Sequence, residues 1–430
     1  MIDARPGGVR GRLARILPIL PVLVAEAILW LGFGALLPVL PLYITEHGID
    51  TATFGWIVAA WPAARLLGEP LFGWLADRGD KRLLMLAGLL ATAVLVPMPL
   101  VLTGVPAFLL ARGLAGLATA AYDPAARAYI LDATPPADRG AAFGLYNSAQ
   151  MGGLLLGPAF GGVGAALGGG YVFPFVFCSV AVVAAAVLLG LTIMRRPVPV
   201  HVAGDEAVAG AASSGPASLW NRILVAATVI NVGSFFASGT YEVIWSLWMT
   251  KLGADLALIG LTFAAFGLGV LVLSPIAGRW SDQHGPLRLI VLGSVGAAAA
   301  GILYSLLQDP VLVVPVVFFE GISFALLAPA LYAVVARGTP VGRSATTQGV
   351  YGAAGTLGTI VASITAGVLF AVDIHLPFYT FAVVMVASLV LGLMIGGRTL
   401  REMGPAPSPA PFPAPAPEST SAAAAVREAT

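Results

Sequence analysis

Apolar stretches long enough to cross a lipid bilayer recur along almost the whole chain, from Leu17 to Leu393. A transmembrane helix needs about 20 residues of this kind. The stretches are continuous rather than alternating, which argues against membrane-spanning strands. Charge is scarce, because only 10% of the 430 residues are charged, against roughly 25% in a globular domain. The sequence therefore predicts an all-α integral membrane protein.

About twelve spans are expected, in two sets of six. The first set is placed at residues 17–43, 54–76, 83–103, 107–131, 141–167 and 171–194, and the second at 223–249, 256–278, 289–307, 310–336, 345–372 and 377–397. The predicted domains are an N-terminal half (1–194), a linker (195–221), a C-terminal half (222–400) and a Pro- and Ala-rich tail (401–430). No function is assigned to the tail.

The basic residues predict the orientation in the membrane. Arg65, Arg112 and Arg127 fall inside spans and Lys251 falls in an odd-numbered loop, which leaves 18 of the 22 Lys and Arg residues at the termini or in even-numbered loops. The positive-inside rule then places both termini in the cytoplasm. Lysine is scarce beside abundant Arg, Ala and Gly, which is typical of a GC-rich bacterial genome and indicates a bacterial cytoplasmic membrane.

Several kinds of binding and catalysis are excluded by composition. The net charge of +1 lacks the excess of positive charge that binds nucleic acid. The single cysteine, Cys178, cannot form an intramolecular disulfide or a cysteine metal cluster. The four histidines fall in predicted loops or tails without a metal motif, and neither a P-loop nor a catalytic triad is visible. We therefore expect no metal, no cofactor and no enzymatic activity. A membrane enzyme or a non-transporting receptor is the least favoured alternative.

The two halves repeat each other. Asp77 in GWLAD and Asp282 in GRWSD are 205 positions apart, and so are Pro124 and Pro329. One offset that holds at distant points of the chain indicates an internal duplication. In such membrane proteins the substrate site lies midway through the membrane, between two halves that rock against each other.

Four motifs of the N-terminal half stand out. Residues 73–82 read GWLADRGDKR, residues 31–41 contain LG and PVLP separated by five residues, residues 112–116 read RGLAG, and residues 153–162 follow GxxxGPxxGG. These motifs resemble those of the major facilitator superfamily, and most closely its twelve-span drug:proton antiporter branch. Gly79 stands one position early and Ala115 replaces a glutamine. The resemblance implies two six-helix bundles that exchange protons for hydrophobic or cationic small molecules by alternating access, the transporter working as a monomer.

The resemblance also implies gating residues. Asp77 would interact with the positive N-terminus of span 11, Lys81 would pair with Asp132, and these contacts would hold the outward-open state. Arg78 belongs to the same loop. The alternative for the basic residues of this loop is that they are solvated and only determine the orientation in the membrane. The fifth-span motif would form a hinge-like seam with span 8, although small residues at this spacing also let any two membrane helices approach. Its gating candidates are Gly153, Gly157, Pro158 and Gly161.

Charges inside predicted spans are the most informative residues. A charge at the bilayer centre costs about 2.5 to 3.5 kcal/mol, so it usually faces a cavity or a partner. Arg65 and Glu69 are four residues apart, as are Asp123 and Arg127. This spacing predicts that each couple neutralises itself on one helix face.

Three intramembrane acids, Glu26, Glu242 and Glu320, have no such local partner and are the better proton-binding candidates. Aromatic residues share the helix face of two of them, which suits an apolar or cationic guest; an aromatic packing stripe is the alternative. The predicted substrate- and proton-binding residues are Glu26, Trp30, Phe33, Arg112, Asn231, Phe235, Glu242, Trp245 and Glu320.

In the family, spans 1, 4, 7 and 10 line the cavity, which would bring Glu26, Arg112, Glu242 and Glu320 together. Glu26 would then bind a proton or the cationic substrate, with Arg112 modulating its proton affinity. Glu320 would be a second acidic site or the ion-pair partner of Arg112. Transport of a sugar or another metabolite is the alternative function on this scaffold.

Overall fold

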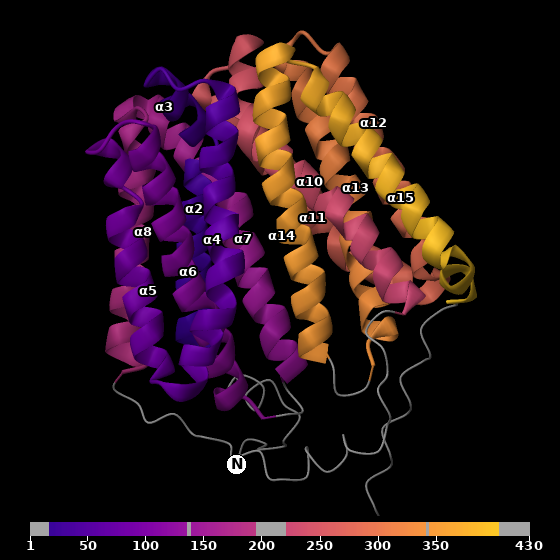
Figure 1. Ribbon diagram of the computed structural model, residues 1–430, viewed down its shortest axis with the longest axis horizontal. Helices are drawn as coiled ribbons and strands as arrows, with labels where there is room; N and C mark the ends of the chain where they lie inside the picture. Colours follow the sequence, from indigo (N-terminus) through magenta and orange to yellow (C-terminus); the bar gives the residue numbers. More distant parts are fainter. Residues whose placement is uncertain (1–16, 136–138, 195–220, 341–343, 404–430) are drawn as a thin grey trace, which may run out of the picture.

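The computed structural model describes residues 17–135, 139–194, 221–340 and 344–403 (Figure 1). Most of the predicted linker, 195–220, and of the predicted tail, 404–430, therefore lies outside the described residues. Within them, the last helix runs to Glu402, slightly beyond the predicted end of the C-terminal half at 400.

The described residues are almost entirely helical. The N-terminal half contains α2 (Leu20–Leu36), α3 (Leu40–Glu46), α4 (Thr51–Arg78), α5 (Lys81–Leu95), η1 (Met98–Leu100), α6 (Val105–Ala133), α7 (Arg139–Gly164), η3 (Ala165–Gly169) and α8 (Val172–Thr192). The C-terminal half contains α10 (Arg222–Lys251), α11 (Leu256–His284), α12 (Pro286–Leu306), α13 (Pro310–Gly338), α14 (Ser344–Val372) and α15 (Leu376–Glu402).

The helices account for the twelve predicted spans. Ten described helices are each long and apolar enough to cross a membrane, and α2 with α3 forms one more span, bent by 42°. The bend lies between Leu36 and Leu40, where Pro38 lacks a backbone donor. The remaining span is α4, whose apolar character is lowered by Arg65, Glu69 and two internal prolines. The protein is thus a multi-pass membrane protein.

The helices form two bundles that lie side by side (Figure 1). In the N-terminal bundle α2 packs against α7, and α4 against α6. In the C-terminal bundle the equivalent pairs are α10 with α14, and α11 with α13. The same packing plan in both bundles agrees with the predicted duplication.

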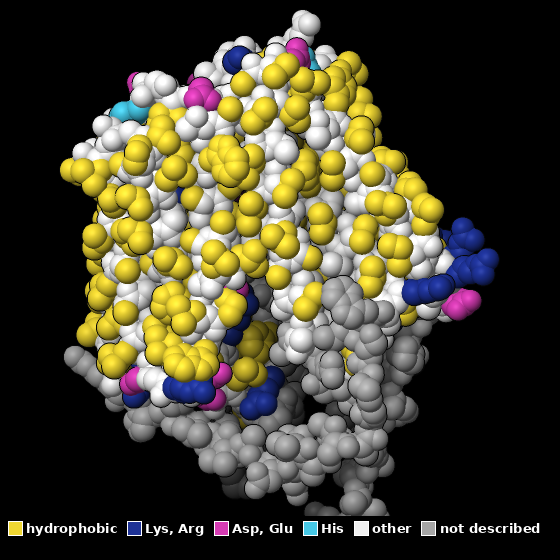
Figure 2. Space-filling model, in the orientation of Figure 1, with side chains coloured by type: hydrophobic (Ala, Val, Ile, Leu, Met, Phe, Trp, Pro, Cys, Tyr) yellow, Lys and Arg dark blue, Asp and Glu magenta, His cyan; other side chains and the backbone are white. Residues whose placement is uncertain are grey.

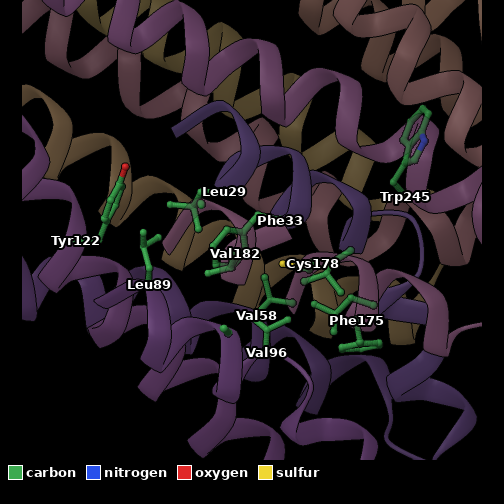
Figure 3. Close-up of a cluster of buried hydrophobic side chains, with 14 of the residues drawn as sticks. Leu29, Phe33, Val58, Leu89, Val96, Tyr122, Phe175, Cys178, Val182 and Trp245 are labelled. Carbon is green, nitrogen blue, oxygen red and sulfur yellow. The ribbon is translucent and has the colours of Figure 1, made fainter. Parts of the chain in front are cut away.

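The interior of the N-terminal bundle is filled by aliphatic and aromatic side chains (Figure 3). Val58, Leu89, Phe175, Cys178 and Val182 are all fully buried there. Leucine and valine side chains are exposed over the outside of the molecule (Figure 2), where lipid can cover them.

The two bundles meet through α4 with α14 and α7 with α11. We call the end at which α8 ends and α10 begins the linker end, and the opposite end the far end. Close inter-bundle contacts lie near the far end. Figure 2 shows the molecule hollowed at the linker end, with basic and acidic side chains on the wall. We call this hollow the central cavity.

Two glycine contacts close the far end. A Cβ atom on Gly162 would lie 2.6 Å from the Leu256 carbonyl oxygen and 2.9 Å from Gly260 Cα. A Cβ atom on Gly367 would lie 3.1 Å from Gly55 Cα. Gly55 and Gly260 are 205 positions apart, as are Gly162 and Gly367, so the duplication has produced the same contact twice. We call these two contacts the glycine seal.

Candidate functional site

Glu26 lies near the linker-end start of α2 and is completely buried. Its Oε1 accepts hydrogen bonds from Trp30 Nε1 at 3.0 Å and from Gln150 Nε2 at 3.1 Å. Its Oε2 has no hydrogen-bond partner among the described residues. The hydroxyl groups of Tyr122 and Tyr146 are its neighbours and interact with the carboxyl group. Glu26 is therefore a buried carboxyl that forms no ion pair within 4 Å with any described residue, although the positive charge of Arg127 acts on it from farther away.

A second group of charges joins α4 to α6. Arg65 Nη2 donates to Glu69 Oε1 at 2.7 Å, as their spacing predicted, and also to Asp123 Oδ2. Asp123 forms its short-range ion pair with Arg65 of the neighbouring helix, and its predicted partner Arg127 interacts with it electrostatically at longer range. Arg127 is exposed and forms no ion pair or hydrogen bond within the described part of the chain.

Arg112 and Glu242 form an ion pair between the two bundles. Arg112 Nη2 donates to Glu242 Oε1 at 2.6 Å, and the side chains are 13% and 20% exposed. Of the two alternatives for Glu320, the ion pair with Arg112 is not formed, because Arg112 pairs with Glu242. Arg112 also does not contact Glu26, whose Oε1 accepts from Trp30 and Gln150 instead. The four predicted cavity charges therefore lie in separate groups.

An aromatic cluster lies beside the two arginines. The rings of Trp30, Phe33 and Trp61 have centroids 5.8 to 6.2 Å apart. The Arg65 guanidinium lies 4.8 Å from the Trp61 centroid and that of Arg112 lies 5.9 Å from it. Sequence reasoning missed Trp61, although it stands one helical turn before Arg65 on the same face.

Glu320 belongs to an aromatic group in the C-terminal bundle. Its Oε1 accepts from the Tyr241 hydroxyl and its Oε2 from the Tyr304 hydroxyl, both at 2.7 Å. The side chain is 2% exposed. Neither tyrosine was predicted, because nothing in the sequence distinguishes them from the other aromatic residues of their spans.

The other predicted residues of span 7 contact the protein itself. Trp245 is buried and donates from Nε1 to Thr262 Oγ1 at 2.8 Å. Asn231 is buried and donates to the Tyr351 carbonyl oxygen at 3.2 Å. Phe235 is half-buried beside Gly355. The contacts of these three residues are packing contacts, which was the alternative to a substrate-binding face.

The predicted gating residues lie at two places. At the linker end Lys81 donates to Asp132, and Arg78 lies over the Trp74 ring at 4.3 Å. Asp77 is exposed and contacts no partner on α14 among the described residues. The molecule is closed at the far end, so the Lys81–Asp132 pair coexists with an open linker end.

The fifth-span glycines pack mostly within their own bundle. Gly153, Gly157 and Gly161 face the backbone of α2, so the expected contact of these glycines with span 8 is wrong for this conformation. Their small size lets α2 and α7 approach closely. The contact with span 8, which is α11, comes from the Pro158 carbonyl group and from Gly162.

The sequence matches the family model of the Major Facilitator Superfamily twice, over residues 22–241 and 227–427. The chain belongs to the Major Facilitator Superfamily. The two matches correspond to the two repeated halves, and membership identifies the molecule as a transporter.

Curated relatives extend over most of this facilitator chain. Multidrug resistance protein 2 of Bacillus subtilis (strain 168) is 28% identical, with 85% of this chain and 92% of that protein covered. Quinolone resistance protein NorA of Staphylococcus aureus (strain COL) is 24% identical, with 85% and 93% covered. Both relatives are therefore similar in overall length.

Solved structures share the fold of this transporter. A bacterial homolog to the human lysosomal transporter Spinster, inward-facing and occupied, has a TM-score of 0.75 at 16% identity, with 94% of this chain and all of that chain covered. The unoccupied form of that homolog has a TM-score of 0.72 at 14% identity, with 92% and 99% covered. At this identity the likeness establishes the arrangement of helices.

Proposed function

We propose that this transporter exports hydrophobic or cationic small molecules in exchange for protons, by alternating access across a bacterial cytoplasmic membrane. The named relatives confer resistance to several drugs or to quinolones. In our proposal the linker end faces the cytoplasm, both termini are cytoplasmic, and the transporter works as a monomer. The open linker end then represents the state that takes up substrate from the cell.

The observation that carries the proposal is the environment of Glu26. Burying an ionised carboxylate costs several kcal/mol unless a cation pairs with it, and Glu26 has hydrogen-bond donors but no ion pair. This conformation therefore favours the protonated carboxyl. A conformation that admits water or a cation to Glu26 favours release of the proton.

The Arg112–Glu242 pair supplies the link to substrate. It joins the bundles in the far-end part of α6 and α10, so it must break when the bundles separate there. A cation beside Glu242, or a proton on it, weakens the attraction to Arg112. Glu320 and its two tyrosines then form a second acidic site in the C-terminal bundle.

The driving force is sufficient for efflux. One proton that moves down a potential of 100 mV releases about 2.3 kcal/mol. At about 1.4 kcal/mol per tenfold change in concentration, this supports a concentration ratio of roughly fortyfold for an uncharged substrate. The exchange of one proton for a monovalent cation moves no net charge and is driven by the pH gradient alone.

The polar side chains argue against the alternative of a sugar. A sugar site needs several free amides and acids in the cavity, but the amide of Gln150 is bonded to Glu26 and that of Asn231 to the Tyr351 carbonyl group. These two buried or half-buried amides are therefore bonded to the protein itself and are not free to bind a polyol.

The test is transport in proteoliposomes. An acidic interior should drive uptake of the hydrophobic cation ethidium through the inside-out molecules. Glu26→Gln should abolish the gradient-driven uptake, whereas Asp373→Asn, a matched change in an exposed far-end loop, should leave it within about twofold. No gradient-dependent uptake by the unmodified protein, or normal uptake by Glu26→Gln, would show that the proposal is wrong.

A further inference from the structure

Trp61 contacts two arginines that belong to different ion-pair groups. The Cζ atom of Arg65 lies 4.8 Å from the centroid of its ring, and that of Arg112 lies 5.9 Å from it. A cation within about 6 Å of a tryptophan ring is attracted by the electron-rich face of the ring. Arg65 pairs with Asp123 inside the N-terminal bundle. Arg112 pairs with Glu242 of the other bundle, so Trp61 touches the arginine that joins the two bundles.

The close approach of α4 to α6 brings the ring to Arg112. Gly116 stands four residues after Arg112 on α6, so both residues lie on the same face of that helix. A Cβ atom on Gly116 would lie only 2.5 Å from the Trp61 carbonyl oxygen. The missing side chain thus lets the two backbones meet at Trp61. This is a physical role for the last glycine of the RGLAG motif.

The ion pair by itself does not fix the orientation of Arg112. Its Nη2 donates to Glu242 Oε1 at 2.6 Å, whereas its buried Nε has no hydrogen-bond partner among the described residues. The strongest arginine–carboxylate pairs use two parallel hydrogen bonds, which fix the plane of the guanidinium group. One bond leaves the plane free to turn about it. The Trp61 ring limits this rotation.

The ring also lies close to the glycine seal. Gly55, which takes part in the seal, stands six residues before Trp61 on α4, or about 9 Å along the helix axis. The seal and the Arg112–Glu242 pair therefore both hold the bundles together in the far-end part of the molecule. Both contacts must break when the far end opens, whereas the contact between Trp61 and Arg112 lies within one bundle and can persist.

We propose that Trp61 is a positioning residue for the ion pair between the bundles. Its ring keeps the Arg112 guanidinium group in the orientation that meets Glu242, so less side-chain entropy is lost when the pair forms. Trp61 thereby favours the conformation closed at the far end. The inference rests on the proposed function only in taking the bundles to separate at the far end.

Spin-label distances across the far-end mouth test the proposal in the purified full chain. The labels are placed on Glu46→Cys and Lys251→Cys, both exposed. Trp61→Leu should raise the ratio of open to closed molecules by about 2- to 12-fold, the effect of freeing one long side chain. Trp61→Phe keeps a ring that attracts cations less strongly and should have a smaller effect. Trp56→Leu, the same change at an exposed position of α4, should leave the ratio unchanged.

The variant Glu242→Gln separates positioning from packing. It removes the ion pair and should itself favour the open far end. If Trp61 acts through the pair, adding Trp61→Leu to Glu242→Gln should change the ratio by less than about twofold. A role of Trp61 in helix packing alone would give the same change in both backgrounds.

The inference is overturned if neither Trp61→Leu nor Trp61→Phe changes the ratio, if Glu242→Gln does not favour the open far end, or if Trp61→Leu acts equally in both backgrounds. Failure of proton-driven ethidium uptake with these distance changes intact would instead overturn the proposed function and leave the role of Trp61 standing.

Discussion

Adding one methyl group to the glycine seal should open the far end. The Cβ atom of Gly162→Ala would meet the Leu256 carbonyl oxygen at 2.6 Å and Gly260 Cα at 2.9 Å. Both are backbone atoms, so α7 and α11 must move apart to admit the methyl group. Overpacking of this kind costs about 1 to 3 kcal/mol, and only the conformation closed at the far end bears the cost.

The equilibrium should therefore shift toward the conformation open at the far end by about 5- to 150-fold. Gly367→Ala, at the equivalent position of the other half, should act in the same direction. Because the two contacts are separate, the effects of the double variant should add.

Pulsed electron paramagnetic resonance measures the shift. Spin labels on Glu46→Cys and Lys251→Cys, exposed residues at the far-end termini of α3 and α10, report the distance across the mouth. The long-distance population should grow in Gly162→Ala and Gly367→Ala. Gly152→Ala is the control, since its Cβ would meet nothing within 4 Å. Unchanged distances in both seal variants, or an equal shift in the control, would refute the reasoning.

Two further predictions concern stability. Arg65→Gln should lower the free energy of unfolding by about 3 to 5 kcal/mol, because it leaves Asp123 buried without its ion-pair partner. Thermal unfolding in detergent measures this loss, with Arg401→Gln as the control. An equal melting temperature in both variants would contradict the prediction. Asp50→Ala should cost about 1 kcal/mol by removing the N-cap of α4. Hydrogen bonds from Thr53 hold the pKa of Asp50 below its ordinary value, so this difference should be present at neutral pH and disappear as the pH falls through that pKa. A difference that does not decrease as the solution is acidified would contradict this.

The fold could be predicted almost entirely from the sequence. Hydrophobic runs of bilayer length determine where helices form, and the offset of 205 residues organises them into two bundles. Only the break between Leu36 and Leu40 changed the expected course of a span, and Pro38 explains it.

The candidate site was less predictable, because pairing across helices depends on how each helix is rotated. The spacing of Asp123 and Arg127 correctly placed both on one face but could not reveal that Arg65 would reach Asp123 first. Arg112 likewise forms its ion pair with Glu242 rather than with Glu320.

Proton flux driven by substrate tests the central claim most directly. Proteoliposomes that contain a pH-sensitive dye and no imposed pH gradient receive ethidium on one side only. We predict that the ethidium gradient moves protons in the opposite direction in the unmodified protein, and that Glu26→Gln exchanges labelled for unlabelled ethidium without moving protons. Ethidium movement with no change in internal pH in the unmodified protein, or equal proton flux in Glu26→Gln, would contradict the account.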